Sequence, residues 1–366
     1  MPRFVKVSVL PLVALIFFPG ALWSSEIILQ SQKTAKIVLD PDDASWRKAL
    51  PVVVPLSAQS MVSPRSGGSA GTLEVKSLYS RDEIAFLLRW KDDSKDSKWD
   101  SSGRFTDACA LQFPMKSGAL PSPFMGDKDN AVNIWRWMAV AQETDRFPKA
   151  YADFYRKDAI ETSVKFPEKP AENLTARGFG TLERLSRQDV DALGRWQDAQ
   201  WRVVLKRRMD STAGVSFKEN SVTPVSFALW NGSNKERDGM KSVAFWQTLL
   251  IGKAARAQGK SPKERGKFVF ARFGCAACHG PDGKGGVKNS NSSGGEVPPL
   301  EFVKEGFTRD EVKETIRKGR NSVSEDSNAP PPPLHMNNWS QIMDEEELGD
   351  LVEYLWSLGP EKTEEW

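Results

Sequence analysis

Short apolar runs separated by turn residues characterise the first two thirds of the chain. Residues 84–90 are apolar at all but one position, which predicts a strand buried on both faces. Residues 130–145 look partly helical or irregular. Comparable short runs lie at 36–39, 71–76, 108–113, 201–206 and 225–230. Many short strands punctuated by Gly, Pro, Asp and Ser predict a mainly β domain, a sandwich or a barrel, over residues 25–255.

The C-terminal part of the chain follows a helical pattern instead. Ser261 can cap a helix over residues 262–273, whose first residue is proline. A final helix at about 344–358 has acids in its first turn and apolar residues on one face. We therefore predict a small all-α domain over residues 265–366. The small and basic stretch at 256–264 is predicted to be a linker.

A basic start and an apolar stretch occupy the N-terminal end. Arg3 and Lys6 precede an apolar run over residues 7–21, and small residues follow it. This order is that of a secretory signal peptide, which we predict over residues 1–24. The run is short and broken by proline, so an uncleaved membrane anchor is the alternative. No later stretch is long and apolar enough to span a membrane, and we expect a soluble mature protein in the periplasm or an equivalent extracytoplasmic compartment.

Composition narrows the possible chemistry. The 366 residues carry a formal net charge of +3, and 39% are hydrophobic against 27% charged. This balance is typical of a globular protein and gives no reason to expect nucleic-acid binding. The two histidines are His279 and His335. A histidine-ligated metal or a histidine-based triad is therefore excluded from the β domain, and no phosphate loop or paired carboxylates indicate catalysis.

The C-terminal domain contains a motif with specific chemistry, Cys275-Ala-Ala-Cys278-His279. This is the c-type haem attachment pattern, in which two thiols add to the haem vinyl groups and the adjoining imidazole binds the iron. A zinc site would need further Cys or His ligands, and only His335 remains. A thioredoxin-type redox pair would not need the histidine, and a plain disulfide is the third alternative. Export and the preceding helix favour one covalent haem c.

The second axial ligand of the haem c iron is predicted to be Met336. It lies after a proline run and before the last helix. A thioether is a soft ligand that favours ferrous iron and raises the reduction potential relative to two histidines. His335 and Met343 are the alternatives, in which case Met336 is a packing residue.

The order of these features resembles that of the class I cytochromes c. The attachment motif, a methionine followed three residues later by Trp339, and a last helix containing Tyr354 match the family. The resemblance covers about residues 262–360. It implies that Gly266 and Phe270 of the first helix pack against Tyr354.

Hydrophobic pattern and composition indicate only that the β domain is exported and rich in tryptophan. Three functions remain possible on this basis: binding of a sugar, docking to another protein, or binding of a second cofactor. Four stretches resemble the haem-binding γ subunits of the type II dimethyl-sulfoxide-reductase family of molybdenum enzymes, of which the ethylbenzene dehydrogenase γ subunit is the defining member. They are 84–92, 107–114, 123–137 and 228–246, in the family order. The resemblance implies a β-sandwich that holds one non-covalent haem b between a methionine and a lysine.

The residues that match these two ligands are Met125 and Lys241. An amine binds iron only when deprotonated, and a free lysine has a pKa near ~10.4, so burial must remove that proton. Lys206 and Lys235 are alternatives for Lys241, and Met125 is otherwise a packing residue of its loop. Cys109 is predicted to be a buried free thiol on a strand.

The resemblance implies an electron-transfer subunit with two haems and no catalytic residues. It would relay electrons between the iron–sulfur β subunit of a molybdenum oxidoreductase, whose α subunit holds molybdopterin, and a soluble cytochrome. The fused cytochrome c domain makes the arrangement most similar to the third subunit of nitrite oxidoreductases. Two other classes stay open: a free-standing exported electron carrier, and a monohaem cytochrome c tethered to a β-sandwich binding module.

Overall fold

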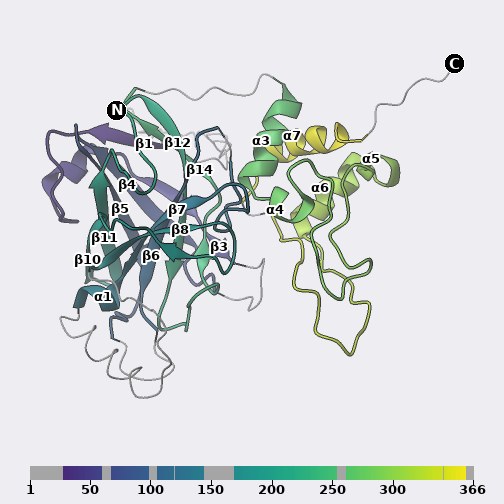
Figure 1. The fold of residues 1–366 in the computed structure, drawn as a ribbon, viewed down its shortest axis with the longest axis horizontal. Coiled ribbons are helices and arrows are strands. Elements are labelled where there is room, and N and C mark those ends of the chain that lie inside the picture. The colour runs from purple at the N-terminus through teal and green to yellow at the C-terminus, as the bar shows by residue number, and fades with distance from the viewer. Residues whose placement is uncertain are drawn as a thin grey trace, which may run out of the picture.

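The computed structural model describes residues 28–59, 67–98, 105–118, 120–143, 169–253, 261–340 and 342–359. The predicted signal peptide and the first part of the predicted linker lie outside these ranges. A β-rich domain occupies one side of the molecule and a smaller helical domain the other (Figure 1). None of the helices in the described ranges has the length and apolarity that a membrane span needs.

The β domain has fourteen strands in its described part, paired in the order β10-β11-β5-β4-β1-β14-β12-β6-β7-β8-β9, with β2, β3 and β13 beside this path. They are β1 (Ile28–Lys33), β2 (Val52–Pro55), β3 (Ser57–Ala58), β4 (Thr72–Tyr79), β5 (Glu83–Lys91), β6 (Ala108–Pro114), β7 (Val132–Met138), β8 (Ala171–Ala176), β9 (Glu183–Arg184), β10 (Asp191–Gln197), β11 (Gln200–Arg208), β12 (Ser221–Trp230), β13 (Ser242–Val243) and β14 (Gln247–Ile251). The helices in the described ranges are η1 (Ala44–Lys48), α1 (Ala139–Glu143), α3 (Pro262–Arg272), α4 (Ala276–His279), α5 (Val303–Gly306), α6 (Arg309–Lys318) and α7 (Glu345–Trp356).

Strand β12 divides this network into two sheets that face each other. Its residues 221–225 pair with β14, and its residues 226–230 pair with β6. Across the gap, Trp137 of β7 lies 6.4 Å from Trp90 of β5 and 4.9 Å from Trp201 of β11, measured between ring centroids. Because β5 and β11 belong to one sheet and β7 to the other, the predicted β-sandwich is confirmed.

Strand β5 is buried on both faces, as its apolar run predicts. Phe86 and Leu88 point into the core between the sheets. Ala85 and Leu87 point the other way and pack beneath Trp46 of η1. The segment that contains η1 thus covers the outer face of this sheet and removes it from water.

Residues 130–145 are only partly as expected. The segment forms strand β7 and then the short helix α1, so the expectation of helical or irregular structure holds for α1 alone. The strand sends Trp135 and Trp137 into the core and Val132 and Ile134 to the outer face, so it has no simple polar alternation, and the inward Asn133 obscures the pattern further. This asparagine is fully buried, and its Nδ2 donates to Asn173 Oδ1 at 2.7 Å.

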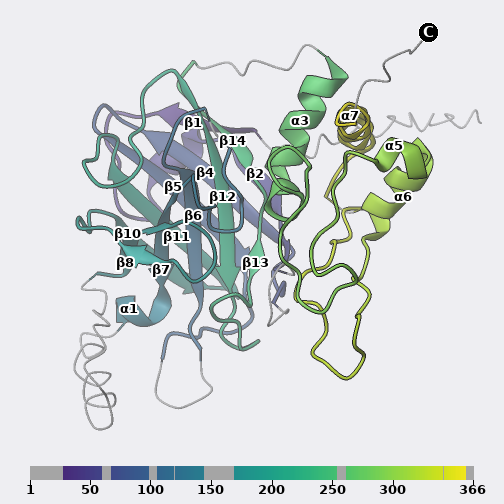
Figure 2. The ribbon, with the colours of Figure 1, turned by 45° about the vertical axis from the view of Figure 1, so that its right-hand side comes forward.

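The helical domain is built on the crossing of α3 and α7, which lie beside the sandwich (Figure 2). Ser261 caps α3 as predicted, and the helix begins at Pro262, before the predicted boundary at residue 265. A Cβ added to Gly266 would lie 1.9 Å from the carbonyl oxygen of Asp350, and the rings of Phe270 and Tyr354 are 5.3 Å apart. The predicted contact of the first helix with Tyr354 is therefore confirmed.

Candidate functional site

The attachment motif lies on the turn that follows α3. Cys275 precedes α4 and Cys278 lies within it, and both are free thiols. Burial raises the pKa of Cys275 to about 12 and that of Cys278 to about 11. A thioredoxin-type pair depends on a lowered thiol pKa. The raised pKa of both thiols argues against a thioredoxin-type pair. Two neighbouring protonated thiols suit covalent attachment of a haem.

His279 ends the same turn with a defined orientation. Its Nδ1 lies 3.4 Å from the carbonyl oxygen of Pro298 and can donate to it. Donation from Nδ1 leaves Nε2 with the lone pair that a metal needs. Burial lowers the pKa of His279, which favours the neutral imidazole. The donor set at this turn therefore fits a c-type haem.

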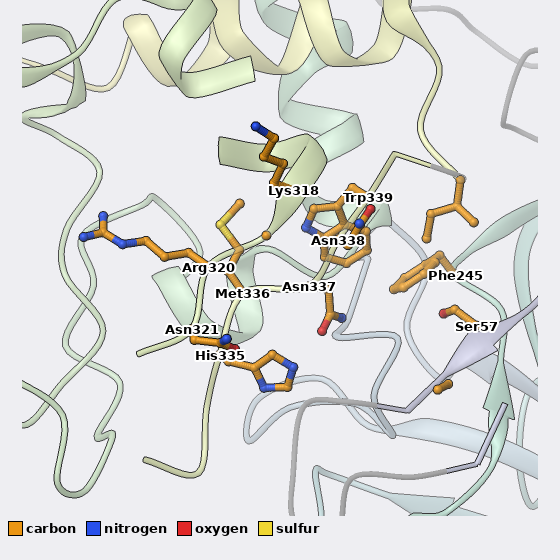
Figure 3. Close-up of a pocket in the computed structure, with 13 residues that line it drawn as sticks. Ser57, Phe245, Lys318, Arg320, Asn321, His335, Met336, Asn337, Asn338 and Trp339 are labelled. Atoms are coloured by element: carbon orange, nitrogen blue, oxygen red, sulfur yellow. The ribbon is translucent and has the colours of Figure 1, made fainter. Parts of the chain in front are cut away.

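Met336 lies on an extended segment that is fixed to the end of α6. Its backbone exchanges two hydrogen bonds with Arg320, at 2.9 and 3.0 Å. Its side chain packs against the apolar cluster that also contacts Cys275 and Cys278. Met343 is buried in the same cluster, whereas the ring of His335 extends to the opposite side of the segment from the Met336 thioether (Figure 3).

A second candidate site lies on the outer face of the sheet formed by β12, β6, β7 and β8. Alternation along these strands sends their large aromatic residues into the core and leaves smaller apolar residues outside. The outer cluster consists of Ala110, Val132, Ile134, Leu174, Ala176 and Trp246, with Leu120, Met125, Ala228 and Trp230 packed against it. The side chains of this cluster are buried, and its composition suits an apolar ligand.

Met125 borders this cluster at the tip of a pinned loop. Gln112 Nε2 donates to the carbonyl of Pro123 at 3.0 Å, and Trp246 Nε1 donates to that of Pro121 at 2.7 Å. Met125 itself has a φ of 69°, a conformation that residues with a side chain rarely adopt. Such strain persists only where the surroundings impose it, and it is frequent at ligand-binding positions.

Lys241 borders the same cluster from the β13 side. Its side chain is buried, with 8% of the residue exposed, and Nζ lies 5.0 Å from the ring centroid of Trp230. Burial, with the charge of Arg136, lowers the pKa of Lys241 to about 8. The charge of Asp238 opposes this lowering only in part. A buried amine that loses its proton easily fits the role of an iron ligand.

The alternatives to Lys241 lie elsewhere. Lys206 belongs to the opposite sheet, where its Nζ pairs with Glu83 Oε1 at 2.7 Å. Lys235 is exposed in a turn. Cys109 is a free thiol buried in the core between the sheets, as predicted, and therefore faces away from the cluster that Met125 contacts.

The residues that join the two domains were not predicted from the sequence. Phe124 and Phe245 of the β domain lie in the apolar cluster of the helical domain, with Phe273 and Trp339. A cavity of about 340 Å³ opens beside them, between β3 and the segment that contains Met336 (Figure 3). Two successive large aromatic residues before a strand, at 245–246, are the signal that could have indicated this interface.

Fold and motifs together define a β-sandwich joined to a helical domain with a c-type haem attachment motif. A family model described as ethylbenzene dehydrogenase matches residues 43–242, and one described as cytochrome c matches residues 263–359. The chain therefore belongs to the ethylbenzene dehydrogenase family and carries a cytochrome c domain. Both resemblances noted in the sequence are confirmed.

Three relatives are similar to this chain over 56% to 63% of its length. The chain is 30% identical over 232 residues to the "Putative respiratory nitrate reductase heme subunit ORF7" of Haloferax mediterranei, covering 63% of this chain and 74% of the relative. It is 28% identical to the chlorate reductase subunit gamma of Ideonella dechloratans (57% and 77% covered) and 28% identical to the dimethylsulfide dehydrogenase subunit gamma of Rhodovulum sulfidophilum (56% and 72% covered).

Among solved structures, a family 9 carbohydrate-binding module from Caldicellulosiruptor kristjanssonii in complex with glucose covers 64% of this chain and 100% of its own. The identity is 8% and the TM-score 0.34, so this likeness carries no conclusion about function.

Proposed function

We propose that this chain is a dihaem electron-transfer subunit of an exported molybdenum oxidoreductase. The observation that carries the proposal is the pairing of two donor sets in one molecule. One set is a c-type attachment turn with a free imidazole nitrogen, and the other is a methionine and a buried lysine at the border of one apolar face. Both sets suit a haem, whose iron supplies reversible one-electron redox chemistry.

In the helical domain, Cys275 and Cys278 would form the thioether links to haem c, and Nε2 of His279 would bind its iron. The Pro298 carbonyl fixes the orientation of this imidazole. Met336 would supply a second ligand to this iron, because it borders the same cluster as the two cysteines on a segment held by Arg320.

In the β domain, Met125 and Lys241 would bind the iron of a non-covalent haem b. Because two hydrogen bonds hold the loop that contains Met125, its thioether already lies at the cluster before a ligand binds. Burial of Lys241 supplies the neutral amine, because a pKa of about 8 lies close enough to neutral pH for metal binding to displace the proton.

The partners follow from the relatives, which are heme or gamma subunits of nitrate reductase, chlorate reductase and dimethylsulfide dehydrogenase. We expect an iron–sulfur β subunit and a molybdopterin α subunit on one side and a soluble cytochrome on the other. The fused cytochrome c domain favours nitrite oxidoreductase as the parent enzyme. Residues 1–24 act as signal peptide, residues 256–264 as linker, and the mature chain works in the periplasm or an equivalent compartment.

Haem quantification tests the proposal. The purified chain is expected to contain haem b, extractable by acid acetone, and covalent haem c in equal amounts. Met125→Leu and Lys241→Gln should lose haem b and keep haem c, because each removes a ligand with little change in volume. Met115→Leu and Lys235→Gln are the matched controls, since both residues lie away from the cluster and should keep both haems.

Each alternative gives a different result. Haem c alone in the wild-type chain would leave a monohaem cytochrome tethered to a binding module. Two haems in a chain that purifies natively without iron–sulfur or molybdopterin subunits would identify a free-standing carrier. Retention of full haem b by both ligand variants would reject Met125 and Lys241.

A further inference from the structure

Four aromatic rings form the contact between the two domains. The ring of Phe245, which precedes β14, lies 5.4 Å from that of Phe273 and 5.0 Å from that of Trp339. Phe124 approaches Phe245 from the same domain at 5.9 Å. In Figure 3 the Phe245 ring points from the sandwich towards Trp339. Phe245 is therefore the ring that touches all the others.

Phe245 belongs to the β domain, yet it is buried in the core of the helical domain. It is 5% exposed, and it shares its apolar cluster with Leu351 and Leu355 of α7. Separation of the domains would expose this ring and open the cluster to water. Burial of a phenylalanine is among the larger single contributions to a protein interface.

The contact lies next to both sets of candidate ligands. A Cβ added to Gly274 would lie 2.8 Å from the ring of Phe124 and from Pro123 Cδ, and Gly274 has a φ of 71°, so only glycine allows this approach. Gly274 directly precedes Cys275, and Phe124 directly precedes Met125. The two loops that carry the ligands thus touch each other.

A backbone hydrogen bond completes the junction. The amide of Trp246 donates to the carbonyl of Arg272 at the end of α3, at 3.4 Å. Trp246 belongs to the cluster that Met125 borders, and Arg272 is fully buried in the helical domain. Neighbouring residues 245 and 246 therefore connect the two candidate sites, one through a ring and the other through its main chain.

We propose that Phe245 locks the sandwich and the helical domain into one rigid body, so that the two haem sites keep a fixed separation and exchange electrons without domain movement. The proposal rests on the proposed dihaem function. With both haems bound, the exchange would move one electron from the ferrous iron of one site to the ferric iron of the other, with no bond formed or broken and no proton moved. Phe245 is a positioning residue in this scheme.

The test compares Phe245→Ala with the wild-type full chain in two measurements. Replacing a packed phenylalanine by alanine removes a large part of the free energy that holds the two domains together. The population with separated domains should therefore rise on the order of a hundredfold. Amide hydrogen exchange of Trp246, whose hydrogen bond crosses to Arg272, should accelerate by the same factor. Pulsed electron paramagnetic resonance between the two ferric haems should give a narrow distance distribution in the wild type and a broad one in the variant.

Phe245→Leu and Phe302→Ala are the controls. Leucine keeps most of the apolar volume, so exchange should change by less than about tenfold. Phe302 is 55% exposed and outside the interface, so its loss should change neither measurement. A broad distance distribution in the wild type, or unchanged exchange in Phe245→Ala, would overturn the proposal. Haem content is measured first in each sample, so that absence of haem b counts against the dihaem function and not against the lock.

Discussion

The crossing of α3 and α7 allows a sharp prediction at Gly266. A Cβ at this position would lie 1.9 Å from the carbonyl oxygen and 2.6 Å from the carbonyl carbon of Asp350, and 2.8 Å from Tyr354 Cβ. These neighbours are backbone atoms and a Cβ, so no flexible side chain can move aside. Gly266→Ala must therefore separate the helices by more than about 1 Å before ordinary contact distances are restored.

Two opposing effects set the magnitude. Alanine favours a helix over glycine by ~1 kcal/mol. Overpacking of this kind lowers the free energy of unfolding by ~1–3 kcal/mol or more. Because the clash at Gly266 is with main-chain atoms, we expect a cost at the upper end of this range. We expect Gly266→Ala to lower the free energy of unfolding of the helical domain by about 2 kcal/mol.

Gly349 provides the matched control on the partner helix. It also lies within a helix, α7, but a Cβ added there meets nothing within 4 Å. Gly349→Ala should therefore raise the free energy of unfolding by ~1 kcal/mol, because only the higher helix propensity of alanine acts at this position. Guanidinium unfolding of the full chain, followed by far-ultraviolet circular dichroism, measures both variants. A Gly266→Ala chain as stable as Gly349→Ala would refute the reasoning.

Three further predictions concern buried polar groups. Burial, with the charge of Asp92, raises the pKa of Asp107 to about 7, and burial, with the charge of Asp96, raises that of Asp92 to about 6. The stability from the protonated forms is therefore full below pH 3.8 and is lost as the pH rises through 6 and 7. Asp92→Asn should raise the free energy of unfolding above pH 7 by about 1–3 kcal/mol and flatten its pH dependence. Asn133→Ala should destabilise the sandwich by at least ~3 kcal/mol, because a buried guanidinium and an indole that donate to its Oδ1 lose their acceptor. Arg272→Met should cost ~3–5 kcal/mol at neutral pH, since it leaves the carboxyl of Glu347 buried without its partner.

Denaturant unfolding at several pH values checks all three. A pH profile for Asp92→Asn that parallels the wild type would show that the two carboxyls do not act as a pair. A loss below ~1 kcal/mol for Asn133→Ala or Arg272→Met would mean that water replaces the missing partner, contrary to the burial of both sites.

Local sequence signals were reliable wherever neighbouring residues decide the outcome. Ser261 and Asp344 both form capping boxes at the predicted helix starts, since the cap and its partner are three residues apart. The strand at 84–90 was recognised because its burial on both faces removes polar alternation. Strand β7 was not fully recognised, because Asn133 is polar in sequence yet satisfied in the core by residues distant along the chain.

The sequence alone determined the c-type attachment motif, the capped helices and the β-rich class, because each depends on spacing within a few residues. Family resemblance named Met125 and Lys241 as a pair. Only the tertiary structure placed both at the border of one outer sheet face, and Cys109 on the other face. Strand pairing decides which side chains share a face, and pairing joins segments that are far apart in the chain. The same holds for Phe245, whose neighbours across the interface belong to another domain.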